Sequence, residues 1–467
     1  MNIYKKGFLL LLLVWQATTS FAQLSYNTLL VGRWSNDSLP ALGNPDGQRF
    51  NELWGYYDSA KYKEYIIMGG LDSTYFFDVT NPAKIKLCDV EAGVSKKCIN
   101  RDFQTYSHYA YAVNDQYSGS LQVWDLQYLP DSVHKVYDSD SLGRTTHTIC
   151  VYKNYLYMCS NTSASNQRHS MRIASLAKPD SPAFVAVFDA PVVGGTPLFS
   201  NIHDMIIVDD TAYLSCGNDG LFIFNFADPL NPKYIYSLTT YPEKGYNHNS
   251  WLTSDKKHIV FTDENLGLGV KLYEIQNPTT YKLKSIFRSH TGALAHNPFI
   301  VGNGLVYISY YQDGVYLFDI SDDANPKVIA YYDTYPENTS FTGFQGSWGV
   351  YPYLPSGTIF ASDMTHGLFA LRMGITGIQG NKNSMEAMVA YPNPATSEVS
   401  FKLFTPENTI GKITITNATG KIILHDDLFL NFGKNELNKS ISNFSSGIYF
   451  VTISTPFANY TTKFAVQ

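Results

Sequence analysis

Four histidines recur at a regular spacing in the middle of this chain, which has only 11 His among 467 residues. They belong to a series that recurs about every 45 to 56 residues, where a short expected strand opens on a bulky polar or aromatic residue. The members are Trp54, Arg101, His147, His203, His248, His296 and Trp348. Repeats of this length are typical of β-propeller blades, whose innermost strands line a central channel. The series therefore predicts a ring of side chains around one axis.

Three interpretations of this ring are open. First, His147, His203, His248 and His296 could bind a divalent transition metal, with Asp102 and Asp204 as acceptors that set the imidazole tautomers. Second, Arg101 could bind an anion, or Trp54 and Trp348 could stack on a carbohydrate. Third, the imidazoles could have a purely structural role, in which they hydrogen-bond neighbouring blades at the channel mouth. We favour this third interpretation. Four histidines spread around a wide channel could be too far apart for one ion.

Motifs of common enzymes are absent from the sequence: it has no Gly-x-Ser-x-Gly, no His-Glu-x-x-His and no phosphate-binding loop. The pair Asp263-Glu264 could act as general acid and base, but we interpret it as a solvated turn. The sequence therefore favours a binding protein over an enzyme, with no cofactor established beyond the metal considered for the channel.

Each repeat can be divided into four short strands, most clearly around His203. Strands are expected at 203–208, 211–216, 221–226 and 233–238, separated by Asn218-Asp219-Gly220 and an Asp-Pro-Leu-Asn-Pro loop. The last repeat lacks a fourth strand, and Leu29–Trp34 is a spare strand before the first repeat. We therefore expect an all-β fold with a seven-bladed, four-stranded propeller, closed by this N-terminal strand.

The N-terminus has the features of a secretory signal peptide over residues 1–22. Lys5 and Lys6 precede an apolar stretch, and Ser20-Phe21-Ala22 offers a cleavage site. No later apolar run is long enough for a transmembrane helix, and no basic patch indicates nucleic acid. The pairing of the five cysteines is left open; they are Cys88, Cys98, Cys150, Cys159 and Cys216.

Several segments resemble the LVIVD-repeat propellers, and more closely the choice-of-anchor B family of exported bacterial proteins. They include Asn51–Gly55, Asn100–Phe103, Gly119–Leu126, His248–Thr253, Gly346–Pro352 and Pro355–Met364. The resemblance covers roughly residues 24–374 and implies a surface-associated propeller without an established activity. At Asn100-Arg101-Asp102 the chain departs from the Trp-Arg-Asp of the family.

The tail resembles the C-terminal sorting domain of type IX secretion substrates from Bacteroidota. The likeness lies in Tyr391-Pro-Asn-Pro394, in Gly447-Ile-Tyr-Phe-Val451 and in Lys463 near the end. Turn-separated strands here fit a small Ig-like β-sandwich. The resemblance implies Sec export, contact with the type IX machinery, and release or attachment at the cell surface.

The expected organisation is a signal peptide (1–22), a propeller (23–374), a linker (375–386) and a sorting domain (387–467). The expected function is that of a non-catalytic binding module for a protein, glycan or small molecule. A metal-dependent hydrolase using the channel histidines and a structural surface component are the alternatives.

Overall fold

A computed structural model describes residues 25–43, 47–337, 341, 343–374, 388–405, 409–430, 433–455 and 459–467. The expected signal peptide and linker lie outside these residues. Within them the fold is all-β, and the only helical element is the short 3₁₀ turn η1 (Pro82–Lys84). In this part of the chain, no helix has the length and apolar character needed to cross a membrane.

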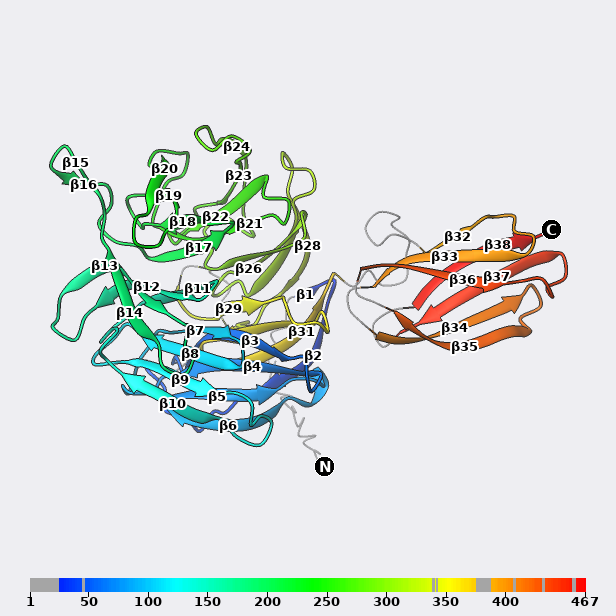
Figure 1. Cartoon of the computed structure of the whole chain (residues 1–467), viewed down its shortest axis with the longest axis horizontal. Helices are drawn as coiled ribbons and strands as arrows, with labels where there is room; N and C mark the ends of the chain where they lie inside the picture. The colour runs from blue at the N-terminus through cyan, green and yellow to red at the C-terminus, as the bar shows by residue number, and fades with distance from the viewer. Residues whose placement is uncertain are drawn as a thin grey trace, which may run out of the picture.

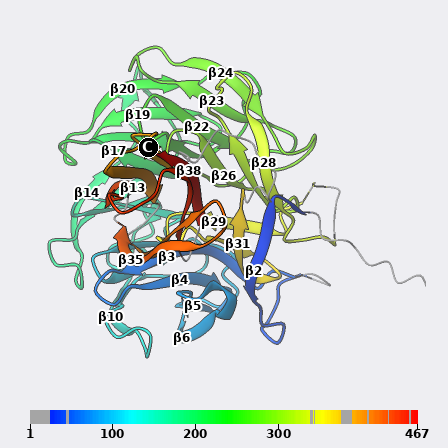
Figure 2. The same cartoon turned by 90° about the vertical axis from the view of Figure 1, so that its right-hand side faces the viewer.

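Residues 25–374 form a β-propeller, in which antiparallel sheets follow one another around a common centre (Figures 1 and 2). The first sheet has the order β3-β4-β5-β6, the second β10-β9-β8-β7 and the third β11-β12-β13-β14. Their strands are β3 (Phe50–Asp58), β4 (Lys63–Gly70), β5 (Ser73–Asp78), β6 (Lys86–Ala92), β7 (Arg101–Tyr106), β8 (Tyr109–Asn114), β9 (Leu121–Asp125), β10 (His134–Ser139), β11 (Thr148–Tyr152), β12 (Tyr155–Thr162), β13 (Arg168–Ser175) and β14 (Ala183–Phe188).

The next sheets are β17-β18-β19-β20, β21-β22-β23-β24 and β25-β26-β27-β28, and the last is β29-β30-β31 with β2. Their strands are β17 (Asp204–Val208), β18 (Thr211–Ser215), β19 (Leu221–Asn225), β20 (Lys233–Leu238), β21 (Asn247–Leu252), β22 (His258–Asp263), β23 (Val270–Glu274), β24 (Lys282–Phe287), β25 (Pro298–Val301), β26 (Leu305–Ser309), β27 (Val315–Asp319), β28 (Lys327–Tyr332), β29 (Ser347–Tyr351), β30 (Ile359–Asp363) and β31 (Gly367–Met373). A small hairpin, β15 (Val192–Val193) and β16 (Thr196–Pro197), projects between the third and fourth of these sheets (Figure 1).

The N-terminal segment closes the ring, as the sequence predicted. Strand β2 (Thr28–Trp34) pairs antiparallel with β31 and becomes the outer strand of the last sheet. Just before it, β1 (Ser25–Tyr26) pairs with β28 of the preceding sheet. The two short strands therefore cover edges that would otherwise be open.

Turn residues and apolar strand faces explain why this local sequence folds as it does. In the fourth sheet, Asp209 and Asp210 both have positive φ in the tight turn that joins β17 to β18. At Gly220 φ is +107°, and a Cβ would lie 2.3 Å from the Leu238 carbonyl oxygen, so only glycine fits. Buried side chains of adjacent sheets, such as Tyr157 and Phe224, share one core cluster between the sheets.

The C-terminal strands form a separate body of two sheets around one core (Figure 1). The sheets are β32-β33-β36 and β35-β34-β37-β38. The strands are β32 (Val389–Tyr391), β33 (Glu398–Thr405), β34 (Thr409–Asn417), β35 (Ile422–Leu430), β36 (Gly433–Ser440), β37 (Gly447–Ser454) and β38 (Asn459–Val466).

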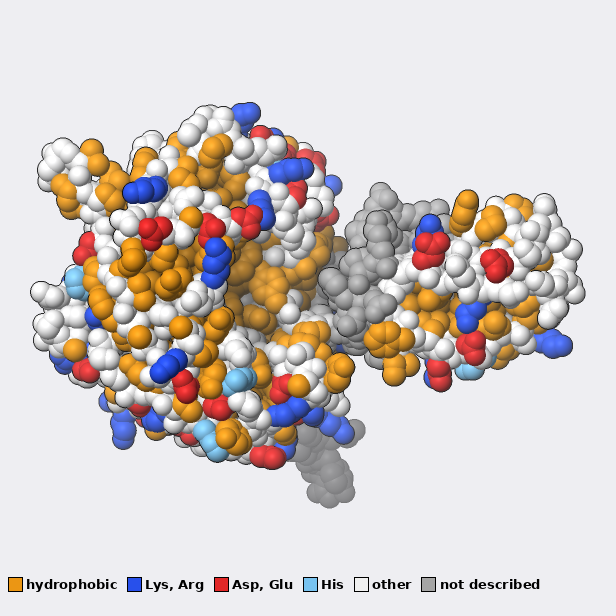
Figure 3. All heavy atoms as spheres, in the orientation of Figure 1, with side chains coloured by type: hydrophobic (Ala, Val, Ile, Leu, Met, Phe, Trp, Pro, Cys, Tyr) orange, Lys and Arg blue, Asp and Glu red, His pale blue; other side chains and the backbone are white. Residues whose placement is uncertain are grey.

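On the face of the molecule shown in Figure 3, Lys and Arg side chains are scattered among Asp and Glu.

All five cysteines are free thiols. Cys150 pairs in register with Tyr157, and Cys159 with Thr148, so the two cysteines are diagonal neighbours. Burial raises the pKa of the Cys150 thiol to about 12 and that of Cys159 well above its usual value. These thiols are packing residues of the core.

Candidate functional site

The four predicted histidines lie next to one another at the start of successive inner strands. The ring centroids of His147 and His203 are 4.2 Å apart, those of His203 and His248 are 4.3 Å apart, and those of His248 and His296 are 4.4 Å apart. Trp348 continues the row, with its ring centroid 5.2 Å from that of His296. The predicted histidine ring is thus a contiguous arc and is not spread evenly around the channel.

Backbone carbonyls determine which imidazole nitrogen carries the proton. His203 Nδ1 lies 3.1 Å from the His248 carbonyl oxygen, and His296 Nδ1 lies 2.6 Å from that of Trp348. A carbonyl only accepts, so each Nδ1 is the N–H donor and each Nε2 keeps its lone pair. These bonds link adjacent sheets. They also leave His203 and His296 as the tautomer whose Nε2 lone pair can bind a metal.

Burial keeps three of the imidazoles neutral. It lowers the pKa of His203 and His248 well below the usual value, with a further contribution from neighbouring imidazoles. It lowers the pKa of His296 to about 3. His147 differs: burial opposes its protonation, but the hydrogen bond and charge of Asp115 outweigh burial and raise its pKa. His147 Nδ1 is 2.7 Å from Asp115 Oδ2, and its Nε2 is 2.6 Å from His203 Nε2.

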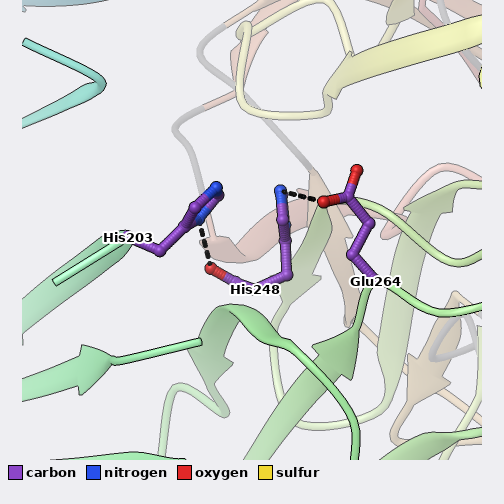
Figure 4. Close-up of side chains that lie close together, drawn as sticks. All are labelled: His203, His248 and Glu264. Atoms are coloured by element: carbon purple, nitrogen blue, oxygen red, sulfur yellow. Dashed lines mark hydrogen bonds and ion pairs between the residues drawn. The ribbon is translucent and has the colours of Figure 1, made fainter. Parts of the chain in front are cut away.

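Glu264 completes the arc, a role that the sequence interpretation missed. It directly follows β22, and its carboxylate lies 3.6 Å from His248 Nε2 and 3.9 Å from His296 Nε2. Figure 4 shows the carboxylate turned toward His248, which stands between it and the His203 ring. Tyr311 donates a 2.6 Å hydrogen bond to Glu264 Oε1. The carboxylate of Glu264 is largely shielded from bulk water, and this burial raises its pKa. The expectation of a solvated turn at Glu264 does not agree with this position.

A layer of carboxylates and amides follows the histidines along the inner strands. Asp204 and Asn249 are joined by a 2.8 Å hydrogen bond, and Asn297 donates a 2.9 Å bond to Glu52. Burial raises the pKa of Glu52 and Asp204 to about 8 each and that of Asp102 to about 7. The predicted residues Asp102 and Asp204 thus face the channel, although neither hydrogen-bonds a histidine ring. Together with Glu52 they form a layer of buried carboxyl groups whose pKa values are all raised.

Trp54 lies in a third layer, on the far side of the carboxylates from the histidines. Its ring is 5.1 Å from that of Tyr351 and 6.4 Å from that of Phe299, and Trp251 packs on Phe299 at 4.7 Å. The rings of Trp54, Trp251 and Phe299 line the channel cavity together with the polar layers. The hydrogen bond from Asn297 shows that Glu52, and not Trp54, lies level with the polar residues of the other sheets.

Arg101 does not reach the channel. Its side chain is fully buried, 1% exposed, and donates hydrogen bonds to the carbonyls of Gly70, Leu71 and Ser95. The preceding residue, Asn100, lines the channel and contacts His147 Nδ1 at 2.8 Å. A shift of one residue along a strand reverses the side-chain direction. Arg101 therefore supports the loop after β6 and is not an anion-binding residue of the channel.

The histidine end of the channel opens into a larger cup of about 730 Å³. His147, His203 and Glu264 line both the cup and the channel cavity. Hydroxyl and amide groups dominate the cup wall; they include Thr145, Ser160, Thr162, Ser170, Ser200 and Asn201. Arg168, His169 and Asp189 add charge, and Phe199 and Tyr246 add aromatic surface. The sequence interpretation did not find the cup, because most of its residues, from the ends of β12 and β13 and from loops, lie outside the repeated positions.

Comparison with known proteins assigns the C-terminal body. Residues 389–467 match the family described as the Secretion system C-terminal sorting domain. They are a type IX secretion sorting domain. The protein is therefore exported by the type IX system, to the cell surface or into the medium, and its tail interacts with the secretion machinery. No curated protein matches the chain.

Solved structures resemble the chain in fold. PorZ, a type IX secretion surface component of Porphyromonas gingivalis, shares 11% identity at a TM-score of 0.49, with 91% of this chain and 61% of PorZ covered. The chain thus spans about three fifths of PorZ. A candidate 6-phosphogluconolactonase of Bacteroides uniformis shares 12% identity at a TM-score of 0.50, covering 84% and 100%. The β-propeller domain of Cps50 from Myceliophteria thermophila shares 10% identity at 0.47, covering 69% and 98%. At identities this low, the likeness to these structures shows a similar fold and nothing more.

Proposed function

We propose that this protein is an exported, non-catalytic binding propeller that holds a small hydroxyl-rich ligand, of mono- or disaccharide size, in the cup at its channel mouth. The observation that carries the proposal is the cup itself. Its volume of about 730 Å³ lies within the range of small-molecule sites. Its hydroxyl, amide and aromatic wall offers paired donors and acceptors together with surfaces on which a sugar ring could stack.

The proposal includes a domain plan. We infer a propeller of seven blades over residues 23–374 with the character of the choice-of-anchor B and LVIVD-repeat family, preceded by a signal peptide at 1–22. The sheets between β2 and β31 support this count. We infer an Ig-like sandwich at 387–467, which the two C-terminal sheets around one core support.

The test is glycan binding by the purified exported chain, first on a glycan array and then by calorimetry with the best monosaccharide or disaccharide. Substitutions Asn201→Ala and Arg168→Ala remove polar groups of the cup. Each is expected to weaken binding about tenfold, equivalent to about 1.4 kcal/mol. The matched control is Asn154→Ala, in the turn between β11 and β12 at the opposite end of these strands. A blank array, or equal losses in the control, would contradict the proposal.

A second candidate function is metal-dependent hydrolysis. Two imidazoles and one carboxylate are a donor set found in catalytic zinc sites, and two of the three residues, His203 and Glu264, line the open cup. Hydrolysis of sugar esters or lactones that needs added Zn²⁺ and stops with a chelator would favour this function over binding alone.

A further inference from the structure

We propose that the channel mouth binds one divalent transition-metal ion of the Zn²⁺ class, coordinated by His203 Nε2, His248 Nε2 and a carboxylate oxygen of Glu264. The potential ligand atoms of these three residues all lie within 4.8 Å of one another. They come from separate places: the residue before β17, the middle of β21 and the residue after β22. The metal site stands independently of the proposed glycan site, and either can fail without the other.

One of the three distances between ligand atoms is already close to that of a loaded site, and none exceeds 4.8 Å. Bonds of about 2.1 Å in tetrahedral zinc place two ligand atoms roughly 3.4 Å apart. His248 Nε2 and Glu264 Oε2 are already 3.6 Å apart. Figure 4 shows that the His203 and His248 rings stand side by side, with the Glu264 carboxylate beyond His248.

The hydrogen bonds around the ligand set orient it for a metal. The carbonyl of His248 accepts from His203 Nδ1, so the lone pair of the His203 ring is on Nε2, 2.6 Å from His147 Nε2. Tyr311 holds one oxygen of Glu264, and the other oxygen faces His248. Metal-binding histidines commonly donate their second nitrogen to a carbonyl or carboxylate in this way. Among the described residues, no Lys or Arg forms a salt bridge with Glu264.

Chemistry and access select the ion. Imidazole nitrogen favours Zn²⁺, Cu²⁺, Ni²⁺ and Fe²⁺ over Ca²⁺ and Mg²⁺, which prefer oxygen ligands. Three protein ligands leave a position of a four-coordinate ion open. His203 and Glu264 both line the cup, so that position faces an entry path. His147, whose Nε2 is 2.6 Å from His203 Nε2 and whose Nδ1 contacts Asp115, is the nearest additional nitrogen donor.

The experiment uses the full exported chain, stripped with a chelator and titrated with Zn²⁺, with Ca²⁺ as the comparison ion. We expect one Zn²⁺ per chain, no comparable Ca²⁺ binding, and tetrahedral-type visible bands when Co²⁺ is bound. Glu264→Gln and His248→Gln should each weaken Zn²⁺ binding by at least about 100-fold, since loss of outer-shell partners alone costs 10- to 100-fold. His258→Gln is the matched control, because His258 pairs with Asp323 away from the channel.

X-ray absorption of the Zn²⁺-loaded wild-type protein provides a readout that needs no variant, and it should show at least two imidazole ligands. Failure to bind Zn²⁺, a zinc shell without imidazole, or unchanged affinity in folded Glu264→Gln and His248→Gln variants would overturn the proposal. The glycan proposal is judged separately by Asn201→Ala, which lies outside the metal ligand set and should leave Zn²⁺ binding unchanged.

Discussion

At the scale of single residues, the channel concentrates carboxyl groups that form no salt bridge with a Lys or Arg in the part of the chain that the structure describes. Glu52 accepts hydrogen bonds from the Leu53 amide and from Asn297, and Asp102 accepts one from the Ile149 amide. These bonds do not offset burial, which raises both pKa values above the ordinary range. Charged carboxylates here therefore reduce stability at neutral pH, and neutral or cation-bound forms relieve the cost.

Glu52→Gln should stabilise the protein at alkaline pH. The folded-state pKa of about 8 exceeds the unfolded value of 4.5, so the stability that this group contributes is complete below 4.5 and is lost as the pH rises through about 8. Glutamine does not ionise, so the variant does not lose this stability as the pH rises. We expect a gain of about 2–4 kcal/mol at pH 8.5 and little change at pH 4.5, since one pKa unit is about 1.4 kcal/mol. Denaturant unfolding at both pH values measures it, and a pH-independent effect would contradict it.

The Lys271–Asp263 ion pair should be required for folding stability. Both side chains are fully buried, and Tyr241 also donates to Asp263 at 2.7 Å. Lys271→Met leaves a buried carboxylate without its cation, which costs about 3–5 kcal/mol. The paired substitution Lys271→Met/Asp263→Asn should recover part of that loss. Lys153→Met, which removes the exposed pair with Asp210, is the control and should cost under about 1 kcal/mol. Equal unfolding free energies for Lys271→Met and Lys153→Met would refute the expectation.

Sequence spacing predicted the histidines well because they occupy one repeated position before the inner strand. It failed for Glu52 because Trp54 was taken as the equivalent of the histidines, although Trp54 lies further along its strand, beside Phe299 and Tyr351. It failed for Glu264 because side chains that follow the second strand were not compared across repeats. Asp115 follows β8 and Glu264 follows β22, and both contact channel histidines. Comparing that second position between repeats could have found Glu264.

At the scale of elements, the N-terminal strand joins the first and last sheets. The β2 backbone pairs with β31, while its last residue, Trp34, packs on Phe50, Tyr75 and Phe77 of the first sheet. One element thus supplies hydrogen bonds to one side of the closure and aromatic packing to the other. This pairing was predictable, because an incomplete last repeat and a spare first strand are both visible in the sequence.

Trp34→Ala should weaken this closure. The indole ring centroid is 4.7 Å from that of Phe77 and 5.8 Å from that of Phe50, and truncating such a packed ring costs about 3–5 kcal/mol. Tyr26→Ala is the matched control, since Tyr26 on β1 is 49% exposed. Thermal unfolding and protease susceptibility at the N-terminus measure the difference. If Trp34→Ala and Tyr26→Ala lower the melting temperature equally, packing by β2 is not what closes the ring.

At the scale of the whole molecule, the sorting domain and the propeller have separate cores. The sorting domain at 389–467 has its own hydrophobic core, built from residues such as Val399, Ile415 and Val451. The channel, the cup and the closure are all formed within residues 25–374. Because neither set of residues contributes to the other's core, removal of the tail should change location without changing ligand or metal binding.

Deletion of residues 387–467 should therefore trap the propeller in the periplasm while leaving it folded. The sorting domain is the part of the chain that interacts with the secretion machinery. The cluster of His203, His248 and Glu264 remains complete in the truncated chain. Cell fractionation and surface proteolysis measure location, and near-ultraviolet circular dichroism measures folding. Ile415→Asp, which places a charge in the tail core, should mislocalise the full-length chain in the same way. Surface exposure of the truncated propeller would show that its export does not depend on the tail.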